Sequence, residues 1–202
     1  MNQPRTATTF PPPVMEARRW LQGVTFSQVR PLINVSQAAP VDPPPVALRQ
    51  AIADAALKND EAHLYGPVLG LPELRAELAA QTGSHYAASV TPAQVCITSG
   101  CNQAFAAAIA TLCAEGDEVI LPTPWYFNHK MWLDMSGART VALPTGPNLL
   151  PDPDRAAALI TDKTRAIALV TPNNPGGVEY PADLMLAAAG CAVFFALTFI
   201  AT

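Results

Sequence analysis

The sequence predicts an α/β fold built around a mainly parallel sheet with flanking helices. From residue 90 onward, short apolar segments alternate with helical segments at the spacing typical of βαβ units. Half of the 202 residues are hydrophobic and only 14% are charged, so the chain has enough apolar material for a core and is unlike a disordered protein.

The first 90 residues predict an arm followed by helices. A short helix is expected around residues 16–22, within an otherwise extended arm. Helical spacing of apolar residues predicts a second helix at 44–58. A third is expected at 72–81, because Pro72 suits a first helical turn and Gly83 suits the position just after a helix.

Beyond residue 90, glycine and proline residues separate segments whose composition is that of a strand and of a helix in turn. Gly116 and Gly137 are expected to stop the first two helices of this series. The expected strands cover 94–98, 118–121, 140–143 and 166–170, and the expected helices cover 102–114, 127–135 and 154–160.

Composition narrows the classes of function. The 12 Lys and Arg residues against 16 Asp and Glu residues give a net charge of −4, which argues against a nucleic acid partner. The four cysteines form no CxxC pair and no cluster with histidine, so we expect neither a disulfide framework nor a metal site. Because the N-terminus has no signal-peptide pattern, the expected compartment is the cytoplasm.

A first candidate site is the segment Thr98-Ser99-Gly100-Cys101-Asn102-Gln103, where an expected strand gives way to a helix. Backbone N–H groups at a helix start bind phosphate, and glycine lets a ligand approach the backbone closely. The alternative is an ordinary capped turn. The segment matches neither a dinucleotide-binding nor a Walker motif, so it gives no support to an NAD or ATP site.

A second candidate is the aromatic run Trp125-Tyr126-Phe127, which follows the expected strand at 118–121. Ligands bind at the carboxyl ends of parallel strands, and an aromatic ring placed there can stack on a flat ligand. Packing in the core is the alternative. The nearby His129 either orients a neighbouring carboxylate or satisfies a backbone carbonyl.

Two loops are further candidates. The segment Thr171-Pro172-Asn173-Asn174-Pro175-Gly176-Gly177 follows the last expected strand. Its prolines and glycines favour a tight turn, while its amide side chains offer hydrogen-bond donors and acceptors to a ligand. The loop Tyr65-Gly66-Pro67 stands before the helix at 72–81 and by itself indicates only a structural turn.

In this order, the four motifs together resemble the class I/II aminotransferases, which are fold type I enzymes that use pyridoxal phosphate. The resemblance covers roughly residues 28–183. It implies an N-terminal arm followed by part of the large domain of these enzymes. Residues 36–40 are similar to the family branch that has a Ser-Gln-Ala-x-Pro start. The motifs are Tyr-Gly-x-x-x-Gly-x-x-x-Leu-Arg at 65–75, Ser-Gly-x-x-Gln at 99–103, Pro-x-Tyr-x-x-His at 124–129 and Pro-x-Asn-Pro-Gly at 172–176.

The resemblance assigns cofactor contacts to five residues. Gly100, Cys101 and Asn102 are expected to hold the phosphate of pyridoxal phosphate at a helix N-terminus. Tyr126 is expected to stack on the pyridine ring. Asn174 is expected to hydrogen-bond the phenolic oxygen of the ring and to lie near the substrate carboxylate.

Three further residues receive roles from the resemblance. Tyr65 is expected to reach the phosphate in the neighbouring subunit, which implies a homodimer with a shared site. His129 is expected to lie behind an aspartate that tunes the ring nitrogen, and Ala39 to lie at the substrate entrance. The implied substrates are an amino acid and a 2-oxo acid.

The sequence departs from the family at the reacting groups. No acidic residue follows Asp183, so the aspartate that keeps the pyridine nitrogen protonated is missing. The lysine that forms the Schiff base is also missing, because none of Lys58, Lys130 and Lys163 occupies its place. We therefore expect an incomplete aminotransferase that is inactive alone and has no catalytic residue of its own. The alternative is a non-catalytic relative that dimerises or binds a ligand.

The segments implied by this reading are an arm at 1–43, a partial large domain at 44–183 and an apolar tail at 184–202. The tail carries no charge and shows no helical periodicity. We favour truncation or a frame shift as its origin. A membrane anchor is less favoured, since the length is sufficient but no Lys or Arg flanks it, and a buried helix–strand pair is the third interpretation.

Overall fold

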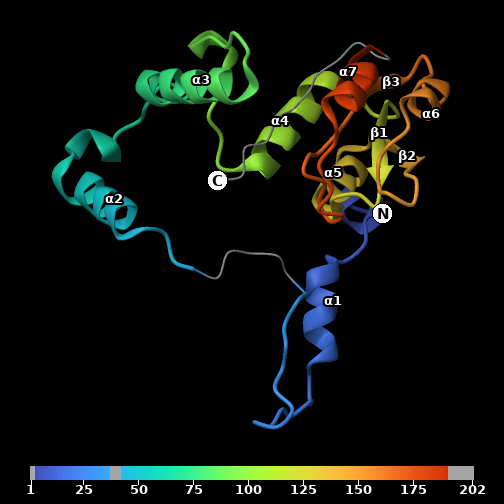
Figure 1. Ribbon diagram of the computed structural model, residues 1–202, viewed down its shortest axis with the longest axis horizontal. Coiled ribbons are helices and arrows are strands. Elements are labelled where there is room, and N and C mark those ends of the chain that lie inside the picture. The colour runs from blue at the N-terminus through green and yellow to red at the C-terminus, as the bar shows by residue number, and fades with distance from the viewer. Residues whose placement is uncertain (1–2, 37–41, 191–202) are drawn as a thin grey trace. The chain divides into compact units, whose positions relative to one another are not determined.

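The computed structural model describes residues 3–36 and 42–190. The chain divides into two compact units, one formed by Met1–Val24 with Ser99–Thr202 and the other by Thr25–Thr98 (Figure 1). These units are defined by how densely their residues contact one another. They do not test the segment boundaries expected after residues 43 and 183, which stay predictions.

The first unit contains the predicted parallel sheet. Its three strands lie in the order β2-β1-β3, and both pairs are parallel. The central strand β1 (Glu118–Thr123) pairs with β2 (Arg139–Pro144) and with β3 (Thr164–Ile167). A strand paired on both sides and covered on both faces requires a continuous apolar run, which the sequence supplies at 119–121.

Side chains that alternate along β1 enter two different cores. Val119 and Leu121 pack with residues of helices α4 (Cys101–Leu112) and α5 (Phe127–Ser136). Ile120 points to the other face, where it packs in a cluster with Ala156 of helix α6 (Pro153–Ala158). Because successive strand residues face opposite sides, the sheet is the middle layer of three.

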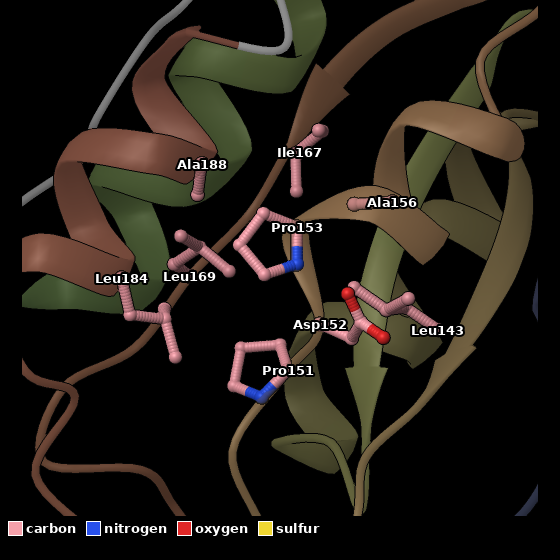
Figure 2. Close-up of a pocket in the computed structure, with 9 residues that line it drawn as sticks. All are labelled: Leu143, Pro151, Asp152, Pro153, Ala156, Ile167, Leu169, Leu184 and Ala188. Carbon is pink, nitrogen blue, oxygen red and sulfur yellow. The ribbon is translucent and has the colours of Figure 1, made fainter.

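Helix α7 (Ala182–Gly190) contacts α6. Figure 2 shows an apolar hollow between these two helices and the sheet, lined by Leu169, Pro151 and Pro153, with Leu184 and Ala188 of α7 on its other side. Asp152 caps α6, since its carboxylate accepts hydrogen bonds from the N–H groups of the first helical turn.

The N-terminal segment of this unit is held on the end of α5. It contains a 3₁₀ helix η1 (Arg5–Thr8) and the helix α1 (Pro13–Trp20). The Arg5 guanidinium donates to the Ser136 carbonyl and to Glu115 Oε2, both at 2.6 Å. The helix expected around 16–22 begins earlier, because Pro13 at the first position needs no N–H partner.

The second unit is helical and has almost no core. It contains α2 (Val46–Lys58), η2 (Asp60–His63), α3 (Pro72–Tyr86) and η3 (Pro92–Gln94). Helix α2 buries no residue, and α3 buries only Ala79. Large apolar side chains are therefore exposed, including Leu57 at 81%.

Two expectations about local structure are wrong. The apolar segment 94–98 is not a strand, because within the described residues it pairs with no other strand and is tied to Leu69 by one backbone hydrogen bond from Ile97. Helix α3 passes through Gly83 and ends at Tyr86, and the following Ala87 takes a left-handed conformation (φ 50°).

The sequence after residue 183 shows no helical periodicity, yet the structure forms a helix in the described part of that segment. Helix α7 runs to Gly190, and residues 191–202 lie outside the described part of the chain. Among the described helices, none has the length and apolar character needed to cross a membrane.

Candidate functional site

The carboxyl edge of the sheet brings two of the predicted motifs to neighbouring strands. The aromatic run follows β1, and the loop 171–177 follows β3. Because β1 and β3 are parallel neighbours, both connections leave from the same edge. The Thr123 carbonyl at the end of β1 accepts a hydrogen bond from Thr145 Oγ1 at 2.7 Å, which fixes this edge next to the end of β2.

The start of α4 has the properties of an anion site. Gly100 precedes the helix with φ 84° and ψ 170°, a conformation that is essentially restricted to glycine. A Cβ atom built at Gly100 would meet no atom within 4 Å, so the backbone faces open space. Within the described part of the chain, no side chain caps this helix. The first N–H groups of an α-helix, which here include those of Cys101 and Asn102, have no acceptor within the helix itself.

Ser99 lies one residue before the cap position, which is Gly100. Its backbone N–H donates to the Gln103 side-chain oxygen at 2.5 Å. The glutamine therefore holds the turn that precedes the helix, while the first N–H groups of α4 keep their capacity to bind a phosphate. The residues at this turn thus fit a phosphorylated cofactor.

The aromatic run lies beside a buried histidine. Phe105 of α4 stacks on His129 of α5, with ring centroids 3.9 Å apart and planes 14° apart. His129 meets Tyr126 edge to face, with centroids 5.0 Å apart. The Tyr126 hydroxyl accepts a hydrogen bond from Asn128 Nδ2 at 2.6 Å. These contacts connect the helix of the anion site to the tyrosine expected to stack on a cofactor ring.

His129 is an uncharged residue at neutral pH. Only 4% of it is exposed, and burial lowers its pKa to about 4. Desolvation disfavours the imidazolium, because a buried charge loses its hydration. The histidine therefore presents a neutral aromatic ring to its neighbours.

The two asparagines of the loop 171–177 have different environments. Asn173 is buried, its Nδ2 donates to the Tyr180 hydroxyl at 3.0 Å, and its Oδ1 accepts from the Gly176 N–H at 2.9 Å. Its backbone N–H donates to Val178 O at 2.7 Å. Asn174 is exposed in the same loop. Sequence reasoning missed Asn173 and Tyr180 as the residues that hold this loop, since neighbouring asparagines look alike in the sequence.

Tyr180 is the second buried member of this pair. It is 4% exposed, and burial raises the pKa of its hydroxyl, with the hydrogen bond from Asn173 acting in the opposite direction. Its backbone N–H donates to Thr171 Oγ1 at 2.8 Å, so both ends of the loop are joined.

Two other predicted site residues lie outside the described part of this unit. Tyr65 belongs to the unit Thr25–Thr98, where its side chain is fully exposed. Ala39 lies outside the described residues.

None of the three lysines has a place suited to bonding a cofactor. Lys58 pairs with Asp54 on α2 at 3.0 Å, and Lys130 forms an ion pair with Asp134 on α5. Lys163 lies at the opposite edge of the sheet, where its carbonyl accepts from the N–H of Glu118 at the start of β1.

Comparisons with known proteins agree with this geometry. The family model for "Aminotransferase class I and II" matches residues 30–191. The chain is 34% identical over 149 residues to the aspartate/prephenate aminotransferase of Thermus thermophilus, covering 73% of this chain and 37% of that protein. It is 32% identical to a probable N-succinyldiaminopimelate aminotransferase of Mycobacterium tuberculosis, covering 80% of this chain and 41% of that protein.

Solved structures show the same relationship. A crystal structure of an aminotransferase from Mycobacterium tuberculosis matches with a TM-score of 0.81 and 27% identity, covering 95% of this chain and 49% of that chain. The aspartate aminotransferase of Thermus thermophilus with maleate matches with a TM-score of 0.80 and 28% identity, covering 96% and 50%. This chain spans half or less of the length of these relatives, and it belongs to the class I and II aminotransferase family.

Proposed function

We propose that this chain forms the phosphate- and ring-binding part of a pyridoxal-phosphate-dependent aminotransferase. The proposed reaction moves an amino group between an amino acid and a 2-oxo acid. The observation that carries the proposal is the open space beside the Cβ position of Gly100, at the start of a helix whose Phe105 stacks on His129, which in turn meets Tyr126 edge to face. Anion binding and ring stacking together match a phosphorylated pyridine.

The residues have separate tasks in this proposal. Gly100, Cys101 and Asn102 hold the phosphate at the start of α4, and we call these three residues the phosphate cup. Tyr126 stacks on the pyridine ring, and Asn174 hydrogen-bonds the phenolic oxygen and lies near the substrate carboxylate. When bound, pyridoxal phosphate supplies an electron sink for the substrate carbon. The buried pair of Asn173 and Tyr180 supports Asn174 by fixing its loop.

Further contacts complete the proposed site. His129 lies behind an aspartate that the described residues do not supply, and Ala39 lies at the substrate entrance. Tyr65 reaches the phosphate of a second subunit, so the proposed assembly is a homodimer with a shared site. The exposed position of Tyr65 is compatible with this role. We place the protein in the cytoplasm, where the thiols of Cys96, Cys101 and Cys113, which are free in the structure, stay reduced.

The 202 residues by themselves are expected not to complete the reaction. Covalent attachment of the cofactor needs an amine at the carboxyl edge of the sheet. Lys58 and Lys130 are held in ion pairs, and Lys163 is at the opposite edge. These positions also favour a second candidate function, in which the chain is a non-catalytic relative that binds a phosphorylated ring or dimerises.

The test is a titration of the full 202-residue chain with pyridoxine 5′-phosphate, which has the phosphate and the ring but no aldehyde. We expect saturable binding that is stronger than that of inorganic phosphate and that Tyr126→Leu weakens. Tyr86→Leu is the matched control, because Tyr86 is exposed on α3 in the other unit. Absence of saturable binding refutes the proposed site.

A second measurement separates the two candidate functions. The chain is incubated with pyridoxal phosphate, reduced with borohydride and analysed by peptide mass spectrometry, and amino group transfer is assayed in parallel. We expect no stoichiometric modification of one lysine and no turnover. Specific reduction onto one lysine together with turnover contradicts the expected inactivity of this chain. Activity that appears only after addition of the downstream part of a relative supports the enzyme over the non-catalytic binder.

A further inference from the structure

Three aromatic rings form a continuous path from the phosphate cup to Tyr126. Phe105 lies four residues after Cys101, one turn further along α4, and is 1% exposed. It stacks on His129, which in turn meets the edge of Tyr126. The backbone N–H of His129 also donates to the Tyr126 carbonyl at 3.0 Å. The path therefore joins the two parts of the proposed site inside one unit.

We infer that Phe105 is a positioning residue that acts through His129 to hold the Tyr126 ring at a fixed place relative to the phosphate cup. The inference rests on the proposed function, because the cup and the stacking ring are its two parts. Tyr126 is then already oriented for stacking when the phosphate of the cofactor binds.

The contacts of the two neighbouring rings support this role. Tyr126 is held by the edge contact with His129, by the hydrogen bond from Asn128 Nδ2 to its hydroxyl and by a tilted ring contact with Phe127. His129 is packed face to face on Phe105 with planes only 14° apart, so rotation of the imidazole would separate the two faces. An aliphatic side chain in place of Phe105 fills similar space but offers no planar face. The imidazole of His129 would then lose the face that orients it against Tyr126, while the core stays filled.

A purely structural role for Phe105 makes a different prediction. Phe105 belongs to the core cluster that also contains Ile109, Leu121 and Leu133. If Phe105 only filled the core, its replacement would lower stability in the same way as a replacement of Ile109, which is 2% exposed one turn further along α4. Neither change would then alter the preference for a ligand with a ring over a ligand without one.

The experiment measures two dissociation constants by calorimetry for the full chain, one for inorganic phosphate and one for pyridoxine 5′-phosphate. For Phe105→Leu we expect about fivefold weaker binding of pyridoxine 5′-phosphate and a change of less than about twofold for inorganic phosphate. For the control Ile109→Val we expect a lower melting temperature with the ratio of the two constants unchanged. An unchanged ratio in Phe105→Leu, with wild-type binding intact, overturns the inference alone. Wild-type protein that binds neither ligand overturns the proposed function.

A measurement on the wild-type chain keeps the inference testable if Phe105→Leu does not fold. The chain has three histidines, and the exposed His63 provides the reference for the proton spectrum, because His85 lies against the ring of Tyr86. The stacked geometry predicts that ring protons of His129 are shifted upfield by the Phe105 ring current. We also expect these signals to move when pyridoxine 5′-phosphate is added. Signals of His129 that coincide with those of His63, or that do not respond at ligand concentrations shown by calorimetry to saturate the wild type, overturn the inference.

Discussion

Replacing Gly100 with alanine tests the phosphate cup at the residue whose backbone conformation is the most restrictive. The conformation of Gly100 (φ 84°, ψ 170°) is one that an L-amino acid adopts only with strain of about 1–3 kcal/mol. The added methyl group points into open space, because no atom lies within 4 Å of the Cβ position. Alanine therefore strains the turn and also fills space that a phosphate would occupy.

The two effects have separate magnitudes. A strain of about 2 kcal/mol corresponds to a fall in melting temperature of about 4–8 °C for a chain of this size. Loss of one hydrogen bond between a backbone N–H and a charged phosphate costs about 1.5–3 kcal/mol, which is about 10- to 150-fold in affinity. We expect Gly100→Ala to show both effects.

Gly116→Ala is the matched control. Gly116 has nearly the same φ (83°) and also has no atom within 4 Å of its Cβ position, but it lies in the turn before β1 and not at the start of α4. Both variants are examined by thermal unfolding and by calorimetric titration with inorganic phosphate at low salt. We expect similar losses of stability and a loss of affinity in Gly100→Ala alone. Equal phosphate affinities of the two variants would refute the assignment of the cup.

Three further outcomes are expected from urea unfolding. The pKa of His129 is lowered to about 4 from an unfolded value of 6.5, so its contribution to stability is fully present above pH 6.5 and declines as the pH falls toward 4. We expect the wild type to lose about 2 kcal/mol between pH 7 and pH 5 from this group, and His129→Asn not to show this loss. In Tyr180→Phe, the Asn173 amide loses its buried acceptor, and we expect a destabilisation of about 1–3 kcal/mol; an unchanged midpoint would show that the loop does not depend on this bond. The pKa of Glu118 is lowered chiefly by its hydrogen bond from Arg139, so the contribution of Glu118 is present above about pH 4.5 and is lost as the pH falls further. Glu118→Gln is expected to flatten this acid limb, and an acid limb identical to that of the wild type contradicts the role of the ion pair.

The sheet could be predicted from the sequence because its strands are short apolar runs bounded by turn residues. Expected strands at 118–121, 140–143 and 166–170 correspond to β1, β2 and β3, with ends that differ by at most three residues. The same reasoning failed at 94–98. An apolar run can be buried without pairing, and the sequence alone does not say whether a neighbouring strand is available to pair with it. The predicted end of α3 was wrong for a different reason. Ala87 takes the left-handed conformation that usually belongs to a glycine after a helix, so Gly83 was expected to mark the end.

The candidate site could be predicted in part. Gly100 before a helix and Tyr126 after a buried strand could be placed from the sequence, because both patterns are local: a glycine at a helix start suits an anion, and β1 is an apolar run followed by aromatic residues. The contact of Phe105 with His129 could not be predicted, since it joins residues 24 positions apart and depends on how α4 packs on α5. The separate roles of Asn173 and Asn174 were equally hidden, because burial distinguishes them and their residue type does not.

The two compact units differ in how they can fix a site residue. Gly100 and Tyr126 are held within a unit whose central strand has Val119 and Ile120 fully buried, so packing inside this unit orients them. Tyr65 is in a unit where α2 buries no residue and α3 buries only Ala79, so no comparable packing fixes its place. Exposed apolar surface of this extent is typical of an interface. In the proposed homodimer, the contact that covers α2 and α3 is therefore the same contact that places Tyr65, and phosphate affinity should already exist in one chain and increase on assembly.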